Sequence, residues 1–458
     1  MAKYGLIGKS LIHSQSKNLH ELIDKYEYDL IEVNEESEIK AILDDTSYDG
    51  FNVTIPYKDK VIKYLDDISL LAKEINAVNV VKRMPNGKLY GYNTDVDGFI
   101  HLVGDRAKDR KCFILGTGGA ARAAAVGLER SGAESIKLVS RNPEAARERL
   151  GRAYPIITYT EFKHCYDAQV IVNATPVGTI PNNEETPMSN AMESVRVFEN
   201  LELAVDLIYN PYRTKFLQDC HRINGCKTIS GLEMLLFQAI ETRNLWMGDI
   251  NERLEKKLED GRIKKRILKN QLNIVAIGMP GSGKTTIFRK YANELGMKFI
   301  DIDAETEKLM GDSIETVLTD ENRGESYFRE MEHQAIKNAC KCTGAVIATG
   351  GGSILNPLNR DLLRSNGVVI YMRRPLEKLA IKGRPISQKV GVEALYKERD
   401  RIYKRTADFT ITNSHTFGAK KAETGEGDSY NYEMKKFVYT INKRVERYYD
   451  EIASNKWT

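Results

Sequence analysis

The sequence predicts an α/β protein with several domains, on three observations. The chain has 458 residues, which exceeds what one hydrophobic core usually supports. Short β-branched apolar runs alternate with helical patterns, as in parallel sheets whose strands are connected by helices. Two glycine-rich segments each follow such a run and precede a helical pattern, which is where nucleotide-binding turns occur. We therefore expect ligands at the carboxyl ends of the strands.

The composition is typical of a soluble globular protein. Hydrophobic residues make up 41% and charged residues 29% of the chain, and the formal net charge is +4. This small charge gives no reason to expect nucleic acid or a membrane as a partner. The N-terminus lacks the apolar core of a signal peptide, and no apolar run is long enough to cross a bilayer. We expect a cytoplasmic protein.

The 6 cysteines and 7 histidines are dispersed along the chain. No Cys-x2-Cys spacing suggests zinc, so we expect reduced thiols and no metal cage built from neighbouring residues. This expectation does not exclude a magnesium ion that binds together with a nucleotide.

The expected strands fall into two groups on either side of a polar segment. They are 112–116, 136–140, 168–173 and 203–208 in the first group, and 273–277, 345–349 and 367–372 in the second. Residues 251–271 predict a charged interdomain linker. Its basic second half could contact nucleic acid, but a solvated helical face is favoured because aromatic residues are absent. Residues 414–434 predict a flexible insertion before a last amphipathic helix at roughly 436–450.

The second group of strands opens with the P-loop pattern G-x4-G-K-[ST], from Gly278 to Thr285. It follows the strand at 273–277 and precedes a helix that should begin near Thr286. Its backbone N–H groups converge on phosphates, Lys284 reaches the outer phosphates, and Thr285 ligates Mg²⁺. The predicted ATP-binding residues here are Gly278, Gly281, Ser282, Gly283, Lys284, Thr285 and Thr286.

Further motifs select among the enzyme classes that share a P-loop. In chain order they are Phe299-Ile300-Asp301-Ile302-Asp303, Gly324-Glu325 with Phe328-Arg329 and Glu332, Gly350-Gly351-Gly352, Arg384-Pro385, and Arg399 with Tyr403. Through them the C-terminal half resembles shikimate kinase. The resemblance implies Lys284 and Asp303 as catalytic residues, Asp303, Arg329, Gly351 and Arg399 for the substrate, Thr285 and Asp301 for Mg²⁺, and Arg384 on a mobile lid over the phosphates.

The chemistry suits these residue types. A guanidinium pairs with a carboxylate through two bonds, and Asp303 can accept the proton of the attacking hydroxyl. The lid around Lys382-Gly383-Arg384 looks short, and the insertion at 414–434 is a second departure from the family. Neither removes a group that the chemistry needs. Another polyol acid, such as gluconate, stays an alternative substrate, against which Arg329, Arg399 and Asp303 argue.

The first group of strands carries the turn Gly116-Thr117-Gly118-Gly119-Ala120, between the strand at 112–116 and a small-residue helix. Its glycines depart from G-x-G-x-x-G, so an ordinary tight turn is the alternative. Ser140, Arg141 and Asn142 follow the next strand, where enzymes specific for NAD place a carboxylate. Because none is present and Arg141 can pair with a 2′-phosphate, NADP is favoured over NAD.

Residues 4–247 resemble shikimate dehydrogenase through a longer series of motifs. These are Ser14-x-Ser16, Asn52-Val53-Thr54-x-Pro56-x-Lys58, Ala77-Val78-Asn79, Asn93-Thr94-Asp95, Asn173-Ala174-Thr175-Pro176-x-Gly178, Asp206-x-x-Tyr209-x-Pro211-x-x-Thr214, and Gly231 with Met234-Leu235 and Gln238. The resemblance implies Lys58 and Asp95 as a catalytic pair that protonates the alkoxide formed on hydride transfer. It implies substrate contacts from Ser14, Ser16, Thr54, Asn79, Asp95, Tyr209 and Gln238, and cofactor contacts from Gly116, Gly118, Gly119, Ala120, Ser140, Arg141, Asn142, Thr175 and Gly231.

Three residues differ from that family's pattern. Lys17 replaces a proline, Asn76 a glycine, and Thr179 a methionine that lies near the nicotinamide in the family. We expect the last change to affect cofactor affinity most. The resemblance also sets the predicted domains: a substrate-binding domain at 1–101, a Rossmann-like NADP domain at 102–228, helices at 229–250 that return to the first domain, the linker at 251–271, and a P-loop kinase domain at 272–458.

The sequence thus predicts a bifunctional enzyme with NADP(H), ATP and Mg²⁺ as cofactors. One half would reduce 3-dehydroshikimate to shikimate, and the other would phosphorylate shikimate. Quinate is the alternative substrate of the first half, although the kinase argues against it. One half could instead be a regulatory or scaffolding module, against which Lys58, Asp95, Lys284, Thr285 and Asp303 argue. The sequence leaves the oligomeric state and any transfer of shikimate between the sites open.

Overall fold

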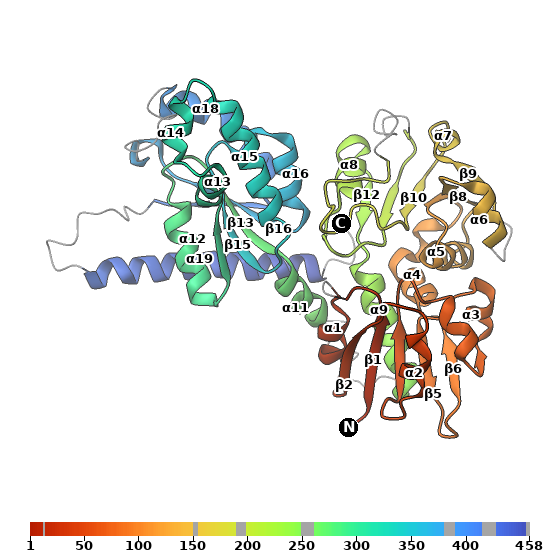
Figure 1. The fold of residues 1–458 in the computed structure, drawn as a ribbon. Coiled ribbons are helices and arrows are strands. Elements are labelled where there is room, and N and C mark those ends of the chain that lie inside the picture. The colour runs from red at the N-terminus through yellow and green to blue at the C-terminus, as the bar shows by residue number, and fades with distance from the viewer. Residues whose placement is uncertain are drawn as a thin grey trace. The chain divides into compact units, whose positions relative to one another are not determined.

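The computed structural model describes residues 1–11, 14–149, 154–188, 198–248, 261–379, 390–414 and 427–454. The chain divides into two compact units, and the boundary lies between Ile267 and Leu268 (Figure 1). Each unit has its own sheets, helices and hydrophobic core. The predicted α/β class is confirmed.

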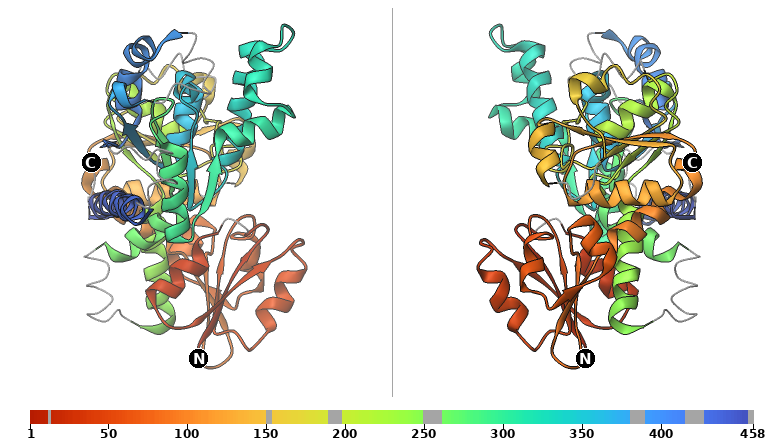
Figure 2. Two further views of the ribbon diagram at one scale, coloured as in Figure 1. Left: turned by 90° about the vertical axis from the view of Figure 1, so that its left-hand side faces the viewer. Right: turned by 90° about the vertical axis from the view of Figure 1, so that its right-hand side faces the viewer.

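The first unit begins with a mixed sheet in the strand order β2-β1-β3-β5-β6-β4. β1 pairs in parallel with β2 and β3, whereas β5 pairs antiparallel with β3 and β6. Helices lie on both sides of this red-to-orange sheet (Figure 2). Its strands are β1 (Lys3–Gly8), β2 (Glu27–Glu32), β3 (Gly50–Val53), β4 (Asp67–Ile68), β5 (Val80–Arg83) and β6 (Leu89–Tyr92). The helical elements are α1 (Ser16–Ile23), α2 (Glu38–Asp44), η1 (Lys60–Tyr64), α3 (Leu70–Ile75), α4 (Asp95–Val103) and η2 (Gly104–Ala107).

The second sheet of this unit is parallel throughout, in the order β12-β11-β10-β7-β8-β9. The chain leaves β7 toward β8 and later returns to β10 on the other side of β7. This reversal of strand order marks where an open α/β sheet binds ligands. The strands are β7 (Lys111–Leu115), β8 (Ser135–Ser140), β9 (Ile156–Thr158), β10 (Val170–Asn173), β11 (Leu203–Asp206) and β12 (Lys227–Ile229), and the helices are α5 (Gly119–Arg130), α6 (Pro143–Arg149), α7 (Tyr159–Phe162) and α8 (Lys215–Asn224).

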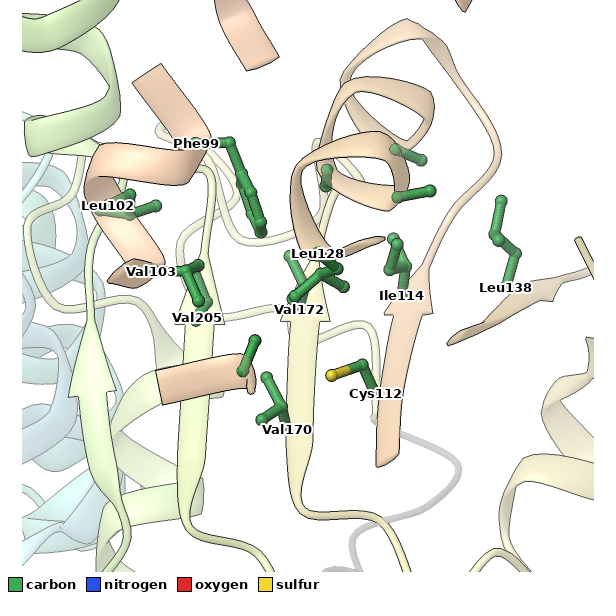
Figure 3. Packing of buried hydrophobic residues seen from close by; sticks show 14 of the residues in the cluster. Phe99, Leu102, Val103, Cys112, Ile114, Leu128, Leu138, Val170, Val172 and Val205 are labelled. Atoms are coloured by element: carbon green, nitrogen blue, oxygen red, sulfur yellow. The ribbon is translucent and has the colours of Figure 1, made fainter. Parts of the chain in front are cut away.

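Helices α4 and α5 cover one face of the second sheet (Figure 3). Phe99 of α4 and Leu128 of α5 pack with Ile114 of β7 in one buried cluster. Gly127 permits this contact, because a Cβ added there would lie 2.6 Å from Cδ1 of Phe99. Since α4 begins with Asp95, this core also fixes the position of that residue.

Helix α9 (Leu232–Met247) follows β12, the last strand of the second sheet. It packs against α4, α1 and β5. Near its end, Trp246 stacks on Tyr4 of β1 with 3.9 Å between the ring centroids. Its indole Nε1 also donates to the Val81 carbonyl at 3.1 Å. These contacts join residues late in the unit to its first sheet.

The second unit contains a parallel sheet in the order β14-β15-β13-β16-β17. Its strands are β13 (Asn273–Ile277), β14 (Lys298–Asp301), β15 (Ala345–Ala348), β16 (Gly367–Arg373) and β17 (Phe409–Thr412). The helical elements are α12 (Lys284–Leu295), α13 (Ile302–Met310), α14 (Ile314–Thr319), α15 (Gly324–Ala339), η4 (Ser353–Leu355), α16 (Pro357–Ser365), η5 (Leu376–Lys378), α18 (Val392–Thr406) and α19 (Gly427–Ser454). In both units, the strands expected from apolar runs are confirmed to within a few residues, since buried parallel strands are continuously apolar.

Two polar segments differ from expectation where the structure describes them. The second half of the expected linker forms α11 (Arg262–Gln271), in which Ile263, Lys264 and Leu268 are buried. The predicted solvated face is present, since Arg262, Arg266 and Asn270 are exposed, but the helix also has a buried face on which the Lys264 ammonium donates to Glu233 of α9. The expected insertion at 414–434 is helical from residue 427, where α19 begins. Residues 251–260 and 415–426 lie outside the described chain.

Candidate active sites

The Lys58 and Asp95 side chains form a short ion pair in the first unit. Lys58 follows β3, and Asp95 is the first residue of α4. Nζ of Lys58 lies 2.6 Å from Oδ2 of Asp95, and the two side chains are 18% and 8% exposed. A charge-assisted hydrogen bond shielded from water is strong, so each group holds the other in one orientation. The structure thus brings the predicted pair together.

Asn79 and Asn93 hold Asp95 from other directions. Asn79 donates from Nδ2 to Oδ1 of Asp95 at 2.9 Å, and its Oδ1 accepts from the Thr94 backbone at 2.8 Å. Asn93 accepts from the Asp95 backbone N–H at 3.0 Å and donates to the Ala77 carbonyl at 3.0 Å. All four polar residues are buried. The carboxylate cannot rotate without breaking a shielded hydrogen bond.

The other predicted substrate contacts lie on separate elements. Ser16 begins α1, Thr54 follows β3, and Gln238 lies within α9. Oγ of Ser14 accepts from the Ser16 backbone at 3.2 Å, which fixes the loop between them. Each of these four side chains is partly exposed, so each can offer a polar group to a ligand. Their contact with substrate stays a prediction.

Tyr209 follows β11, and its side chain contacts the loop that carries Ser14 and Ser16. Burial raises the pKa of its hydroxyl, and a hydrogen bond from the Gln15 backbone opposes that rise. Tyr209 therefore lies near the two serines, although most of the unit separates them in sequence.

The predicted dinucleotide turn connects β7 to α5. Gly116 has a φ of +110°, and an added Cβ would lie 3.1 Å from Cγ2 of Thr175. A Cβ added at Gly118 would meet no atom within 4 Å. The turn is therefore open at Gly118, beside the N-terminus of a helix whose N–H groups attract phosphate. The residues present fit a dinucleotide.

Ser140 ends β8, and Arg141 and Asn142 follow it at the same edge of the sheet. Oγ of Ser140 accepts from the Asn142 backbone at 3.1 Å, and Oδ1 of Asn142 accepts from the Ala145 backbone at 3.1 Å. Arg141 is exposed. This arrangement leaves a guanidinium at the position where a carboxylate would select NAD, which suits the 2′-phosphate of NADP.

Asp206 fixes the loop that begins with Thr175. It is fully buried and accepts from Thr214 Oγ1 at 2.6 Å and from Asn173 Nδ2 at 3.0 Å. Burial raises the pKa of Asp206 to about 7, although these hydrogen bonds oppose the rise. Asn173 in turn accepts from the hydroxyl of Thr175 at 2.7 Å. Asp206 and Asn173 belong to the motifs that the sequence shows, but only the structure shows that their hydrogen bonds hold this loop in place.

The family departures and Gly231 have local explanations. Asn76 caps α3 with a φ of +48°, a left-handed conformation that asparagine tolerates best after glycine. Lys17 is exposed on α1, and Thr179 donates from its backbone to the Pro176 carbonyl at 3.2 Å. Gly231 lies so close to Leu207 that an added Cβ would be 2.2 Å from its carbonyl oxygen. A packing role therefore accounts for Gly231, and its cofactor contact stays a prediction.

In the second unit, the P-loop lies between β13 and α12, as predicted. Gly281 and Gly283 have φ values of +79° and +95°. Nζ of Lys284 donates to the carbonyls of Gly278 at 2.8 Å and Met279 at 3.1 Å. Ser282 is fully buried, and its hydroxyl has no hydrogen-bond partner among the described residues. This loop fits a polyphosphate, which would give the Ser282 hydroxyl a hydrogen-bond partner and attract the Lys284 ammonium. Thr285 and Thr286 are exposed at the start of α12.

Asp301 ends β14, and Asp303 lies in the first turn of α13, near the P-loop. Oδ1 of Asp301 accepts from the Asp303 backbone at 3.1 Å and caps α13. The enclosing protein and the charge of Asp301 raise the pKa of Asp303 to about 6, while Lys284 opposes the rise. The Asp303 side chain itself is exposed, so a substrate hydroxyl can reach a carboxylate of raised basicity.

Each glycine of the Gly350-Gly351-Gly352 triplet has a different close neighbour. An added Cβ would lie 2.5 Å from Oδ1 of Asp303 at Gly350, 2.5 Å from the Pro280 ring at Gly351, and 2.6 Å from both terminal nitrogens of Arg329 at Gly352. The triplet therefore brings the P-loop, Asp303 and Arg329 together, because only glycine lets them approach the same backbone.

The two predicted carboxylate-binding arginines meet this triplet from different helices. Arg329 donates to Glu332 at 2.9 Å and to Glu325 at 3.0 Å. Arg399 is buried on α18. Burial raises the pKa of the Tyr403 phenol, and the charge and hydrogen bond of Arg399 oppose that rise. The Tyr403 hydroxyl donates to the Gly351 carbonyl. The structure thus adds Tyr403 as the link between Arg399 and the triplet.

Sequence reasoning missed two residues that hold the P-loop. Asn413 is fully buried after β17 and donates to the Ser282 carbonyl at 2.9 Å. Arg374 follows β16 and donates to the Gly281 carbonyl at 3.3 Å. Neither belongs to a local motif, so no sequence signal pointed to them. Arg384, which was predicted to cover the phosphates, lies outside the described residues.

Within the described ranges, the structure shows neither a metal-binding cluster nor a membrane-spanning helix. No group of three or more His, Cys, Asp or Glu side chains is arranged to hold a metal ion. No helix in the described ranges is long and apolar enough to span a membrane.

Comparisons with known proteins give a match in each unit. A family model for the shikimate dehydrogenase substrate binding domain matches residues 6–81. A family model for shikimate kinase matches residues 280–424.

Individual relatives match over most of their own length. The shikimate dehydrogenase (NADP(+)) of Caldicellulosiruptor bescii is 36% identical over 272 residues, which are 55% of this chain and 91% of that protein. That of Clostridium perfringens is 39% identical over 261 residues, 54% of this chain and 93% of that protein. A chorismate mutase/shikimate 5-dehydrogenase fusion protein from Clostridium acetobutylicum has 37% identity and a TM-score of 0.51, and the match covers 58% of this chain and 99% of that chain. A shikimate dehydrogenase in complex with NADP⁺ has 32% identity and a TM-score of 0.50, over 58% of this chain and 96% of that chain.

Proposed function

We propose, since the chain belongs to the shikimate dehydrogenase family and also carries a shikimate kinase domain, that it catalyses two consecutive reactions. The first unit reduces 3-dehydroshikimate to shikimate with NADPH, and the second phosphorylates shikimate with ATP and Mg²⁺. The observation that carries this proposal is that one chain holds both the shielded Lys58–Asp95 pair and a P-loop next to Asp303.

In the first reaction, Lys58 is the proton donor. NADPH, when bound, supplies the hydride to the ketone carbon. The ketone oxygen then takes a proton from Nζ of Lys58, which Asp95 keeps oriented at 2.6 Å. Asn79 fixes the other oxygen of Asp95, so the pair does not have to reorganise during the reaction.

The cofactor and substrate contacts of this unit follow from their positions. Backbone N–H groups at Gly118, Gly119 and Ala120 would hold the pyrophosphate, and Arg141 the 2′-phosphate. The substrate-binding set stays as predicted: Ser14, Ser16, Thr54, Asn79, Tyr209 and Gln238.

In the second reaction, Asp303 is the proton acceptor. ATP, when bound with Mg²⁺, supplies the phosphoryl group. Asp303 takes the proton of the substrate hydroxyl as that oxygen bonds to the γ-phosphorus and ADP leaves. Lys284, which now donates to two loop carbonyls, would turn to the phosphates. Thr285 and Asp301 would hold Mg²⁺, directly and through water, and Arg329 and Arg399 would pair with the substrate carboxylate.

A cytoplasmic location accompanies this proposal. All six cysteines are free thiols, and four of them are buried. Free thiols are typical of proteins kept in a reducing compartment.

A coupled assay of the whole purified chain tests the function. With 3-dehydroshikimate and NADPH, we expect loss of NADPH absorbance; after addition of MgATP, we expect ADP to form without added shikimate. ADP that forms only when authentic shikimate is supplied would contradict the dehydrogenase assignment. Oxidation of quinate and of shikimate by NADP⁺ is measured for comparison. If quinate is oxidised faster than shikimate, quinate is the substrate of the first unit and the assignment of 3-dehydroshikimate is wrong.

A further inference from the structure

Arg122 of α5 makes a contact that has no part in the reactions proposed above. Its Nη2 donates to the Asn76 carbonyl at 3.0 Å, and Asn76 caps α3. A Cβ added at Gly119 would lie 3.9 Å from that same Nη2 and 3.8 Å from Cβ of Ala77. The guanidinium therefore lies between the dinucleotide turn and the segment that follows α3.

That segment, residues 76–79, supports both members of the catalytic pair. The Val78 backbone N–H donates to the Lys58 carbonyl at 2.7 Å. Asn79 donates to the Asp95 carboxylate at 2.9 Å. Ala77 accepts from Asn93, which itself accepts from the Asp95 backbone. Three consecutive residues thus each connect to Lys58 or Asp95.

The segment is buried where it contacts the Lys58–Asp95 pair and exposed to solvent where it contacts Arg122. Ala77, Val78 and Asn79 are 1%, 0% and 2% exposed, whereas Asn76 is exposed. A close-packed interior transmits a displacement rather than absorbing it. A shift of the Asn76 carbonyl would therefore be passed along the chain to Lys58 and Asp95.

We propose that Arg122 is a positioning residue that couples the dinucleotide turn to the Lys58–Asp95 pair through residues 76–79. This inference rests on the proposed dehydrogenase activity. Arg122 touches neither reacting group. It holds the Asn76 carbonyl from the helix whose N-terminus receives the cofactor phosphates.

The test compares Arg122→Ala with Arg130→Ala in the full chain. Arg130 lies on the same helix and reaches the same neighbouring helix through Glu74 at 3.2 Å, in an exposed ion pair. We expect Arg122→Ala to lower the dehydrogenase kcat roughly tenfold with little change in either KM, since a small misplacement of reacting groups is costly. Arg130→Ala should stay within about twofold, because exposed ion pairs contribute little. Arg122→Lys, which keeps the positive charge and a donor nitrogen, should recover most of kcat.

A second measurement needs no cofactor and no turnover. In the ligand-free protein, amide hydrogens of Ala77 and Val78 should exchange faster in Arg122→Ala than in the wild type or in Arg130→Ala. Equal effects of the two alanine variants on kcat and exchange would overturn the coupling. So would an Arg122→Ala variant that raises the KM for NADPH more than it lowers kcat, because Arg122 would then bind the cofactor directly. A wild-type chain without dehydrogenase activity would instead reject the proposed function. Unchanged exchange of the buried amide hydrogens of β7 and β10 in each variant verifies that the first unit is folded.

Discussion

The two candidate active sites hold their charged groups in opposite ways. In the first unit, the lysine and carboxylate proposed for proton transfer already contact each other at 2.6 Å and are largely shielded from water. In the second unit, Lys284 donates to carbonyls of its own loop, and Arg329 pairs with Glu325 and Glu332. The difference shows what each site must bind. A ketone group carries no charge that could reorient a side chain, so its proton donor must be held in place before the substrate binds. A polyphosphate carries enough negative charge to draw cations away from their protein partners.

The largest expected effect is at Lys58. Lys58→Ala should lower the dehydrogenase kcat roughly 10²–10⁴-fold, because the proton donor and the partner of Asp95 are removed together. Kinase activity in the same chain should not change. NADPH oxidation and ADP formation, measured separately, give the two rates.

Lys60 is the matched control for that variant. It pairs with Glu36 at 3.2 Å in an exposed position, so Lys60→Ala should keep both activities. If Lys58→Ala keeps more than a tenth of kcat, the short ion pair is structural, and the contrast between the two sites is lost.

The reciprocal change is at Lys284. Lys284→Ala should lower the kinase kcat roughly 10²–10³-fold, since the cation that stabilises the transferring phosphoryl group is removed. Dehydrogenase activity should persist. Lys290→Ala, on the same helix α12, controls for loss of charge. Equal loss from both lysine variants would argue that Lys284 stays on its loop carbonyls during turnover.

A steric change tests how Arg329 is placed. Gly352→Ala adds a Cβ 2.6 Å from both terminal nitrogens of Arg329, so the flexible guanidinium must move while the backbone stays. We expect the KM for shikimate to rise roughly tenfold, as one charge-assisted pair is weakened, with the KM for ATP unchanged. An unchanged KM for shikimate would show that Arg329 serves Glu332 and Glu325 alone.

The smallest effect concerns pH. The pKa of Asp303 is raised to about 6, and its ionised form accepts the substrate proton. The active form is lost as pH falls through that value, so kinase kcat/KM should drop about fourfold between about pH 7 and pH 5.5. Residual activity of Asp303→Asn should lack this dependence. A profile that is flat down to about pH 5 would mean that another group accepts the proton.

Much of the fold was predictable because its signals are local. Apolar runs located the strands of both parallel sheets, and the glycines of both nucleotide turns marked positive φ angles such as +110° at Gly116 and +95° at Gly283. The buried side of α11 was not predictable. Lys264 looks like a solvent-exposed residue in a charged run, and only its bond to Glu233, 31 positions away, makes it a buried one.

The sequence by itself determined the chemical groups of both sites and the families they belong to, since motifs and glycine turns depend on residue type and spacing. The tertiary structure alone decided which groups touch. It brings Lys58 to Asp95 across 37 positions, Arg122 to Asn76 across 46, and Asn413 to the P-loop across 131. It also decided the basicity of Asp303, because the protein around a carboxyl group and the charges near it set its pKa, and both depend on how distant segments pack together.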